Sequence, residues 1–185
     1  HIEEWRNRPL SGEYPYVYLD GIVLKRSWAG EVKNVSVLVA IGVNSDGFRE
    51  ILGVAEGAKE DKAGWGSFLK YLKARNLKGV RLFVTDKNLG VVESLNEYFP
   101  ESRWQRCMVH FYRNVFSCVP NDKVKTVAGM LKAIHAQESR DAALEKAATV
   151  ADKLISMKLS KAAATVRAGI AETLSYYYFP REHWL

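Results

Sequence analysis

The chain has 185 residues, of which 48% are hydrophobic and 26% charged, as in one folded domain of above-average size or a core domain with an insertion. This balance excludes wholesale disorder, and no apolar run approaches the roughly 20 residues that a membrane span needs. The net charge is +6, and residues 101–185 supply most of it, with 13 Lys and Arg against 8 Asp and Glu. This basic half suggests nucleic acid as a partner. A solvated helical surface that is basic by chance also explains the charge.

The first 60 residues are predicted to form three strands. Residues 16–25 and 35–43 are dense in β-branched, aromatic and aliphatic side chains, and residues 48–58 follow the turn sequence Asn-Ser-Asp-Gly at 44–47. The links between these segments are too short for helical crossovers. The sequence therefore predicts an antiparallel meander.

After residue 60 the apolar period becomes helical. The pattern Trp65, Phe68, Leu69 and Leu72 predicts a helix that begins near Asp61. A short buried strand (80–85), a second helix (89–99) and a brief fifth strand (103–107) follow. Residues 108–118 and 122–178 are predicted to be helical, with a break at Val-Pro-Asn (119–121). The fold class is α/β with a mixed five-stranded sheet, followed by an all-helical region.

Asp20 lies in the middle of the first predicted strand, on the same face as Tyr16 and Tyr18. A carboxylate in a buried strand is costly unless it is paired, hydrogen-bonded or bound to a metal. An edge strand with Asp20 facing water, or a turn that begins at Asp20, explains the residue equally well.

Asp86 closes the fourth predicted strand just before a helix, where open α/β sheets place ligands. Asp is also a favoured helix N-cap, which would need no chemistry. Two aspartates on strands that lie side by side would form a site for divalent cations, so Asp20 and Asp86 are the candidate metal ligands.

Cys107 and His110 form a Cys-x-x-His pair, which is half of a zinc ligand set. Because no second pair follows at finger spacing, we expect no structural zinc, with Cys107 packed as a small apolar residue. Arg106, Arg113 and Asn114 are candidates for contacts with DNA phosphate. Two cysteines are too few for a disulfide framework, which favours a reducing cytoplasm.

Four segments of the chain together resemble the mutator-type transposases of bacterial insertion sequences. They are Tyr-Leu-Asp-Gly (18–21), Thr-Asp (85–86), Trp-Gln-Arg-Cys-x-x-His-x-x-Arg-Asn (104–114) and Phe-Pro-Arg-Glu-His-Trp (179–184). The third segment is the most specific, because seven fixed residues in eleven are hard to obtain by chance. The resemblance covers nearly the whole chain.

This resemblance implies a ribonuclease H-like core with an Asp-Asp-Glu catalytic triad, in which Asp20 and Asp86 match the first two acids. It implies a catalytic core at 1–118, a helical insertion at 119–178 and the start of a return to the core at 179–185. It also implies a two-metal site for Mg²⁺ or Mn²⁺, with Asp20 bridging the two ions and Asp86 holding one. The implied partners are double-stranded DNA at the element ends and target, and a second copy in a homodimer. The implied location is the bacterial nucleoid, not a membrane.

The resemblance has three departures. Lys87 stands where the family often has Gly, and the region that binds terminal repeats is expected to precede His1. The family's third acid lies in a Thr-Asn-x-x-Glu-Arg segment expected beyond Leu185, and Glu172 and Glu182 are expected to be surface charges instead.

The favoured function is that of a transposase catalytic core, with the isolated chain inactive. One alternative is an inactive fragment that binds DNA or self-associates. Another is a metal-dependent phosphatase or phosphotransferase, which would have a compact pocket and no basic helical insertion.

Overall fold

The structure is a computed structural model that describes residues 1–28, 30–56 and 61–184. The chain divides into two compact units, His1–Trp104 and Gln105–Leu185, each with its own hydrophobic core. We call them the sheet unit and the helical unit. The sequence predicted a division at 118, and the roles of the two parts as catalytic core and insertion stay predictions.

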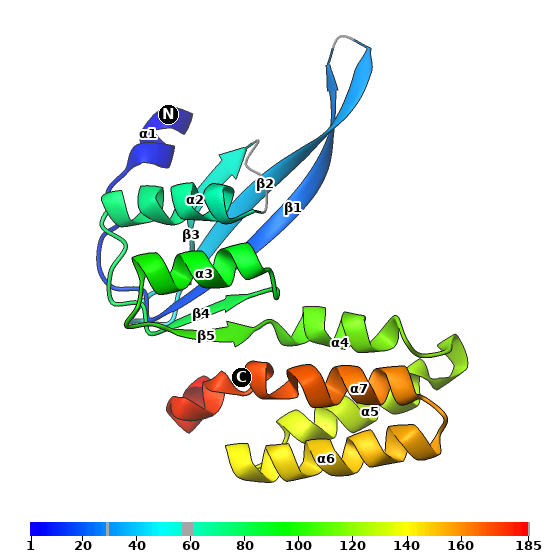
Figure 1. Cartoon of the computed structure of the whole chain (residues 1–185). Coiled ribbons are helices and arrows are strands. Elements are labelled where there is room, and N and C mark those ends of the chain that lie inside the picture. Colours follow the sequence, from blue (N-terminus) through cyan, green and yellow to red (C-terminus); the bar gives the residue numbers. More distant parts are fainter. Residues whose placement is uncertain (29, 57–60, 185) are drawn as a thin grey trace. The chain divides into compact units, whose positions relative to one another are not determined.

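The sheet unit is built on a mixed five-stranded sheet in the order β3-β2-β1-β4-β5 (Figure 1). Its strands are β1 (Tyr16–Trp28), β2 (Glu31–Val43), β3 (Arg49–Glu56), β4 (Leu82–Thr85) and β5 (Arg103–Arg106). The pairs β1–β2 and β2–β3 are antiparallel, whereas β4 runs parallel to β1. This arrangement confirms the predicted meander and the predicted mixed five-stranded sheet.

Two helices, α2 (Lys62–Ala74) and α3 (Leu89–Tyr98), cover one face of the sheet (Figure 1). The Asp61 side chain caps α2 by accepting from the Gly64 amide at 2.8 Å, and the Asn88 side chain caps α3 by accepting from the Gly90 amide at 2.9 Å. The predicted helical pattern is confirmed, because Trp65 and its apolar neighbours on α2 are buried against inward residues of β1 and β2. The opposite face of the sheet is more open, with Tyr18 42% exposed.

Two parts of the sheet unit differ from the prediction. A short helix, α1 (Ile2–Asn7), occupies a region where only strands were expected. Because none of its residues is buried, its sequence has no apolar period that would predict a helix. The first hairpin is longer than predicted, since β1 and β2 pair as far as Trp28 and Glu31. Gly30 has a φ of +82°, which suits a tight turn. The predicted end of the third strand at residue 58 lies outside the described residues.

The helical unit confirms the all-helical region expected after the fifth strand. Its helices are α4 (Met108–Phe116), α5 (Val124–His135), α6 (Arg140–Ser156) and α7 (Ser160–Gly169), with 3₁₀ turns at Asn121–Lys123, Ile170–Thr173, Ser175–Tyr178 and Arg181–His183. Phe111 and Val115 of α4 are fully buried in the core of this unit, which is why the unit begins before residue 119. Among the described residues, no helix is both long and apolar enough to cross a bilayer.

Candidate active site

Asp20 lies within β1, where it pairs with Val39 of β2. Since β1 has β2 on one side and β4 on the other, Asp20 is not on an edge strand, and β1 continues to Trp28 without a turn. Its side chain is exposed, whereas the preceding Leu19 is only 3% exposed, as alternation along a strand requires. Asp20 therefore projects from the face of the sheet that α2 and α3 do not cover.

Asp86 follows the last residue of β4. The parallel register of β1 and β4 ends with Leu19 opposite Thr85, so Asp20 and Asp86 are the next residue on each of two neighbouring strands. Opposite residues of parallel strands direct their side chains to one face, so the register places both carboxylates at one end of the β1–β4 pair. The helix-cap explanation of Asp86 is wrong, because Asn88 caps α3.

Hydrogen bonds hold the backbone and carboxylate of Asp86 although it lies beyond the strand. Its Oδ1 accepts from the Lys87 amide at 2.7 Å, and its carbonyl oxygen accepts from the Asn88 amide at 3.0 Å. The same carbonyl oxygen also accepts from the Thr85 hydroxyl at 2.6 Å. The Thr85 hydroxyl in turn accepts from the Trp104 indole at 2.8 Å. Sequence reasoning missed Thr85 and Trp104 as partners of Asp86, because nothing in their spacing shows that β5 returns beside β4.

The donors at this end of the sheet suit a hard cation such as Mg²⁺, which typically takes one or two carboxylates and fills its other positions with water and substrate phosphate. Within residues 1–28, 30–56 and 61–184, no group of three or more His, Cys, Asp or Glu side chains is arranged to hold a metal ion. Two carboxylates would leave most coordination positions of such an ion to water or other oxygen ligands.

Cys107 and His110 lie one helical turn apart at the start of α4. Cys107 occupies the N-cap position with a free, partly exposed thiol, so the expectation that it packs in a core is only half met. The His110 ring is partly buried, and its Nδ1 has no hydrogen-bond partner among the described residues. The resemblance to mutator-type transposases implies that Cys107 and His110 match a Cys-x-x-His signature of that family, and this role stays a prediction.

Arg106 is 8% exposed and belongs to the interior of the helical unit. Its Nη1 lies 3.5 Å from Glu172 Oε2, and its guanidinium sits over the Phe111 ring at 5.2 Å. A Cβ built on Gly169 would come within 2.7 Å of Arg106 Nη1, so the lack of a side chain there leaves room for the guanidinium. The prediction that Arg106 contacts DNA phosphate disagrees with this burial, and Glu172 is an internal partner instead of a surface charge. Arg113, Asn114 and Glu182 are exposed, as their predicted roles require.

A second polar group, centred on His135, lies in the same core. His135 Nε2 is 2.9 Å from the Thr173 hydroxyl, and its Nδ1 is 2.8 Å from the Tyr112 hydroxyl. Nδ1 also lies 3.2 Å from the Leu131 carbonyl, and Thr173 donates its own proton to the Ile170 carbonyl at 2.7 Å. The tautomer of the ring sets which of its two nitrogens donates. Burial lowers the pKa of His135, which keeps the ring neutral, and raises the pKa of Tyr112 to about 12.

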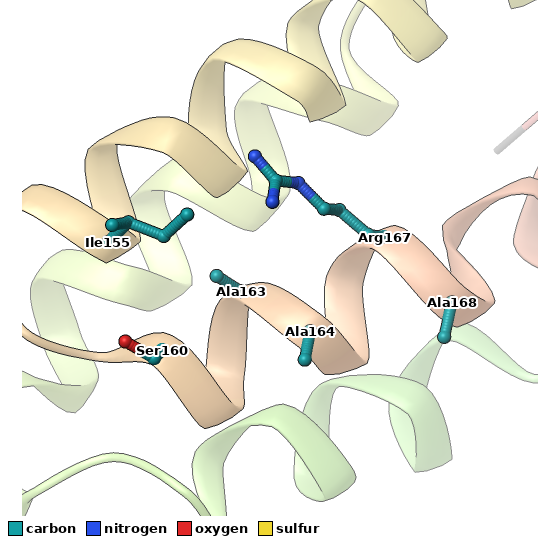
Figure 2. A pocket seen from close by; sticks show the side chains of 6 residues that line it. All are labelled: Ile155, Ser160, Ala163, Ala164, Arg167 and Ala168. Atoms are coloured by element: carbon teal, nitrogen blue, oxygen red, sulfur yellow. The ribbon is translucent and has the colours of Figure 1, made fainter.

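The helical unit also carries a shallow groove along α7 (Figure 2). Its volume is about 600 Å³, and small side chains form most of its wall. The Arg167 side chain at its rim pairs with Asp152 at 2.6 Å. Among the described residues that line the groove there is no carboxylate or imidazole. The lining residues are Ile155, Ser160, Ala163, Ala164, Arg167 and Ala168.

Comparison with known proteins gives one consistent family. Residues 1–185 match the family model described as "Transposase, Mutator family". The chain is 35% identical over 184 residues to the transposase for insertion sequence element IS1081 of Mycobacterium tuberculosis, covering 99% of this chain and 44% of the relative. It is 34% identical over 180 residues to the transposase for IS256 in transposon Tn4001 of Staphylococcus aureus, covering 95% of this chain and 45% of that protein. The chain thus spans less than half the length of these curated relatives.

Among solved structures, the Drosophila P element transposase strand transfer complex matches with a TM-score of 0.38 and 10% identity, over 63% of this chain and 32% of that one. The HTLV-2 integrase catalytic core domain in complex with magnesium matches with a TM-score of 0.29 and 14% identity, over 86% of this chain and 85% of that one.

Proposed function

This chain belongs to the Mutator family of transposases, and we propose that it carries the first two metal-binding acids of an enzyme that cuts and joins DNA at the ends of an insertion sequence. The observation that supports this proposal is the β1–β4 register, which ends one residue before Asp20 and Asp86. Two acids that are 66 positions apart in the sequence thereby reach one end of the sheet.

In this proposal, Asp20 and Asp86 bind and orient divalent cations, Mg²⁺ or Mn²⁺, in front of the sheet face opposite α2 and α3. When bound, such ions activate an attacking oxygen and neutralise charge on the phosphodiester. Asp20 stands on a strand that is paired on both sides, and Asp86 is held by hydrogen bonds from its neighbours. The chain's contribution is to hold the two carboxylates in fixed positions, which is how proteins assist phosphoryl transfer most.

The proposed partner is double-stranded DNA, and the charge of the helical unit supports it. Residues 105–185 contain 12 Lys and Arg against 7 Asp and Glu. Arg113 and Asn114 lie on the exposed side of α4, so both are free to face a phosphate backbone. Contacts of this kind position the protein on a duplex without reading its sequence.

The alternative of a phosphatase or small-molecule phosphotransferase is set aside, because the chain belongs to the transposase family and has a basic helical unit. The alternative of an inactive fragment that binds DNA or self-associates stays open. It differs from the main proposal in one respect: under it, Asp20 and Asp86 would have no role in strand cleavage.

A strand-cleavage assay with Mn²⁺, on the protein with its natural boundaries, tests the proposal. We expect Asp20→Asn and Asp86→Asn each to lower the rate by at least about a hundredfold, since displacing one ligand already costs that much. Asp46→Asn is the matched control, because Asp46 is exposed in the turn before β3. Cleavage by the Asp20 and Asp86 variants at the rate of the Asp46 variant would contradict the proposal.

A further inference from the structure

We propose that Trp104 and Thr85 are positioning residues that fix Asp86, an inference that rests on the proposed metal-binding role of Asp86. The indole Nε1–H of Trp104 donates to Thr85 Oγ1 at 2.8 Å, and the Thr85 hydroxyl donates to the Asp86 carbonyl oxygen at 2.6 Å. All three residues belong to the sheet unit.

The direction of both hydrogen bonds follows from the groups involved. An indole nitrogen can only donate, and a hydroxyl has one proton and two lone pairs. Thr85 Oγ1 must therefore accept from Trp104, and its single proton is left for the Asp86 carbonyl. Thr85 is 2% exposed, so water cannot easily replace either partner, and buried hydroxyls are costly to leave unpaired.

Asp86 needs this support because the β-ladder ends before it. The last β1–β4 pair is Leu19 with Thr85, so Asp86 lies one residue beyond the paired stretch. The Thr85 hydroxyl holds the carbonyl oxygen of that peptide, and the Lys87 amide holds Oδ1 at 2.7 Å. The Asp86 carbonyl and the Lys87 N–H belong to the same planar peptide group. A shift of the carbonyl would therefore move the N–H that holds Oδ1, and with it the carboxylate.

Trp104 reaches Thr85 because β5 is fastened to the strand region before β4. The Arg103 amide donates to the Arg81 carbonyl at 2.8 Å, and the Ser102 hydroxyl donates to the Val80 carbonyl at 2.7 Å. These two bonds lie at the start of the strand pair, and the Trp104 indole extends toward its end. Ser102 therefore offers a control that removes a hydrogen bond between the same segments, away from Asp86.

Partners that orient a metal ligand typically change metal affinity by 10- to 100-fold when they are removed. The test uses Trp104→Phe, which keeps an aromatic ring but loses the N–H, and Thr85→Val, which keeps the shape but loses the hydroxyl. Thr85→Ser should restore the hydroxyl bond. The controls are Ser102→Ala and Trp65→Phe, because Trp65 is 3% exposed and its Nε1 has no partner among the described residues.

Two measurements are made on the whole chain. The first is hydrogen exchange of the Lys87 amide by NMR, which reports the bond to Asp86 Oδ1 in the absence of any metal. The second is a titration with Mn²⁺ alone. We expect Trp104→Phe and Thr85→Val to speed Lys87 exchange and to weaken Mn²⁺ binding by about tenfold or more. Thr85→Ser and both controls should stay within about twofold of the wild-type chain.

The two measurements test the positioning role and the proposed function separately. If Trp104→Phe and Thr85→Val leave Lys87 exchange unchanged, or weaken Mn²⁺ binding no more than Ser102→Ala does, the positioning role is refuted while the proposed function stands. If Asp20→Asn and Asp86→Asn leave Mn²⁺ binding unchanged, the proposed function is refuted. The Lys87 amide then decides alone whether Trp104 and Thr85 hold Asp86 in place.

Discussion

The polar residues predicted to act at a site are placed differently in the sheet unit and the helical unit. In the sheet unit, Asp20 is exposed and Asp86 half-exposed at one end of a strand pair. In the helical unit, Arg106 and His135 are directed inward and bonded to other side chains of the same core. Exposed carboxylates that share one end of a sheet are available to a ligand, whereas buried polar groups with internal partners hold a fold together.

The sequence motif at 104–114 contributes residues to both units, because the boundary between them lies after Trp104. Trp104 bonds to Thr85 in the sheet unit, but Gln105 accepts from the Tyr176 amide at 2.7 Å within the helical unit. Arg106 pairs with Glu172 there as well. Adjacent residues of one sequence signature therefore have separate structural tasks, and only exposed members such as Arg113 are available to DNA.

Cleavage of DNA by the isolated chain has the largest expected effect, and it tests whether the exposed carboxylates of the sheet unit bind metal ions for catalysis. With two carboxylates at the site, we expect the chain to bind Mg²⁺ or Mn²⁺ weakly and to cut DNA poorly or not at all, at least about a hundredfold below a complete site. The measurement is a strand-cleavage assay with Mn²⁺ beside an Asp20→Ala control. Robust cutting that depends on Asp20 would mean that this chain supplies a third acid, and Glu172 would be the first residue to replace.

Removal of the buried cation in the helical unit should affect stability and not metal binding. We expect Arg106→Met to lower the free energy of unfolding by about 2–3 kcal/mol, because it leaves the Glu172 carboxylate without its partner. The effect stays below that of a fully buried pair, since the Glu172 side chain is 27% exposed to water. Urea unfolding measures it, with the exposed Arg113→Met as the control. Equal stability of the two variants would refute the structural role of Arg106.

Replacing Arg113 should weaken DNA binding and leave stability nearly unchanged, in contrast to Arg106. We expect Arg113→Ala to weaken duplex binding several-fold at low salt and to reduce the salt dependence by about one phosphate contact, with little change in stability. Fluorescence anisotropy over a salt series measures this, and Arg106→Met at a temperature where it stays folded serves as the comparison. If Arg106→Met reduces the salt dependence while Arg113→Ala does not, the assignment of the two arginines is reversed.

The antiparallel meander, the helix after Asp61 and the helical region after Met108 could be predicted from the sequence, because the apolar period changes sharply near Asp61 and again at Met108. The position of β5 beside β4 could not, because no local pattern records it. The hairpin beyond Lys25 could not be predicted, since residues there such as Arg26, Ser27 and Glu31 are polar and exposed and show no apolar alternation. The burial of Arg106 was also hidden. It depends on Glu172 and Gly169, which lie more than 60 positions away in the sequence.

The pH dependence of the helical unit gives the smallest expected effect, and its sign follows from His135. Burial lowers the pKa of His135 in the folded chain below its ordinary value of 6.5. Between these two pKa values the unfolded chain binds a proton that the folded chain does not, so stability is full above about pH 6.5 and falls as the pH drops below it. Thermal unfolding from pH 5 to 8 tests this, with His135→Gln expected to flatten the profile and exposed His183→Gln to leave it unchanged. A flat wild-type profile, or one that His183→Gln alone flattens, would show that the buried ring does not couple protons to the folding of this unit.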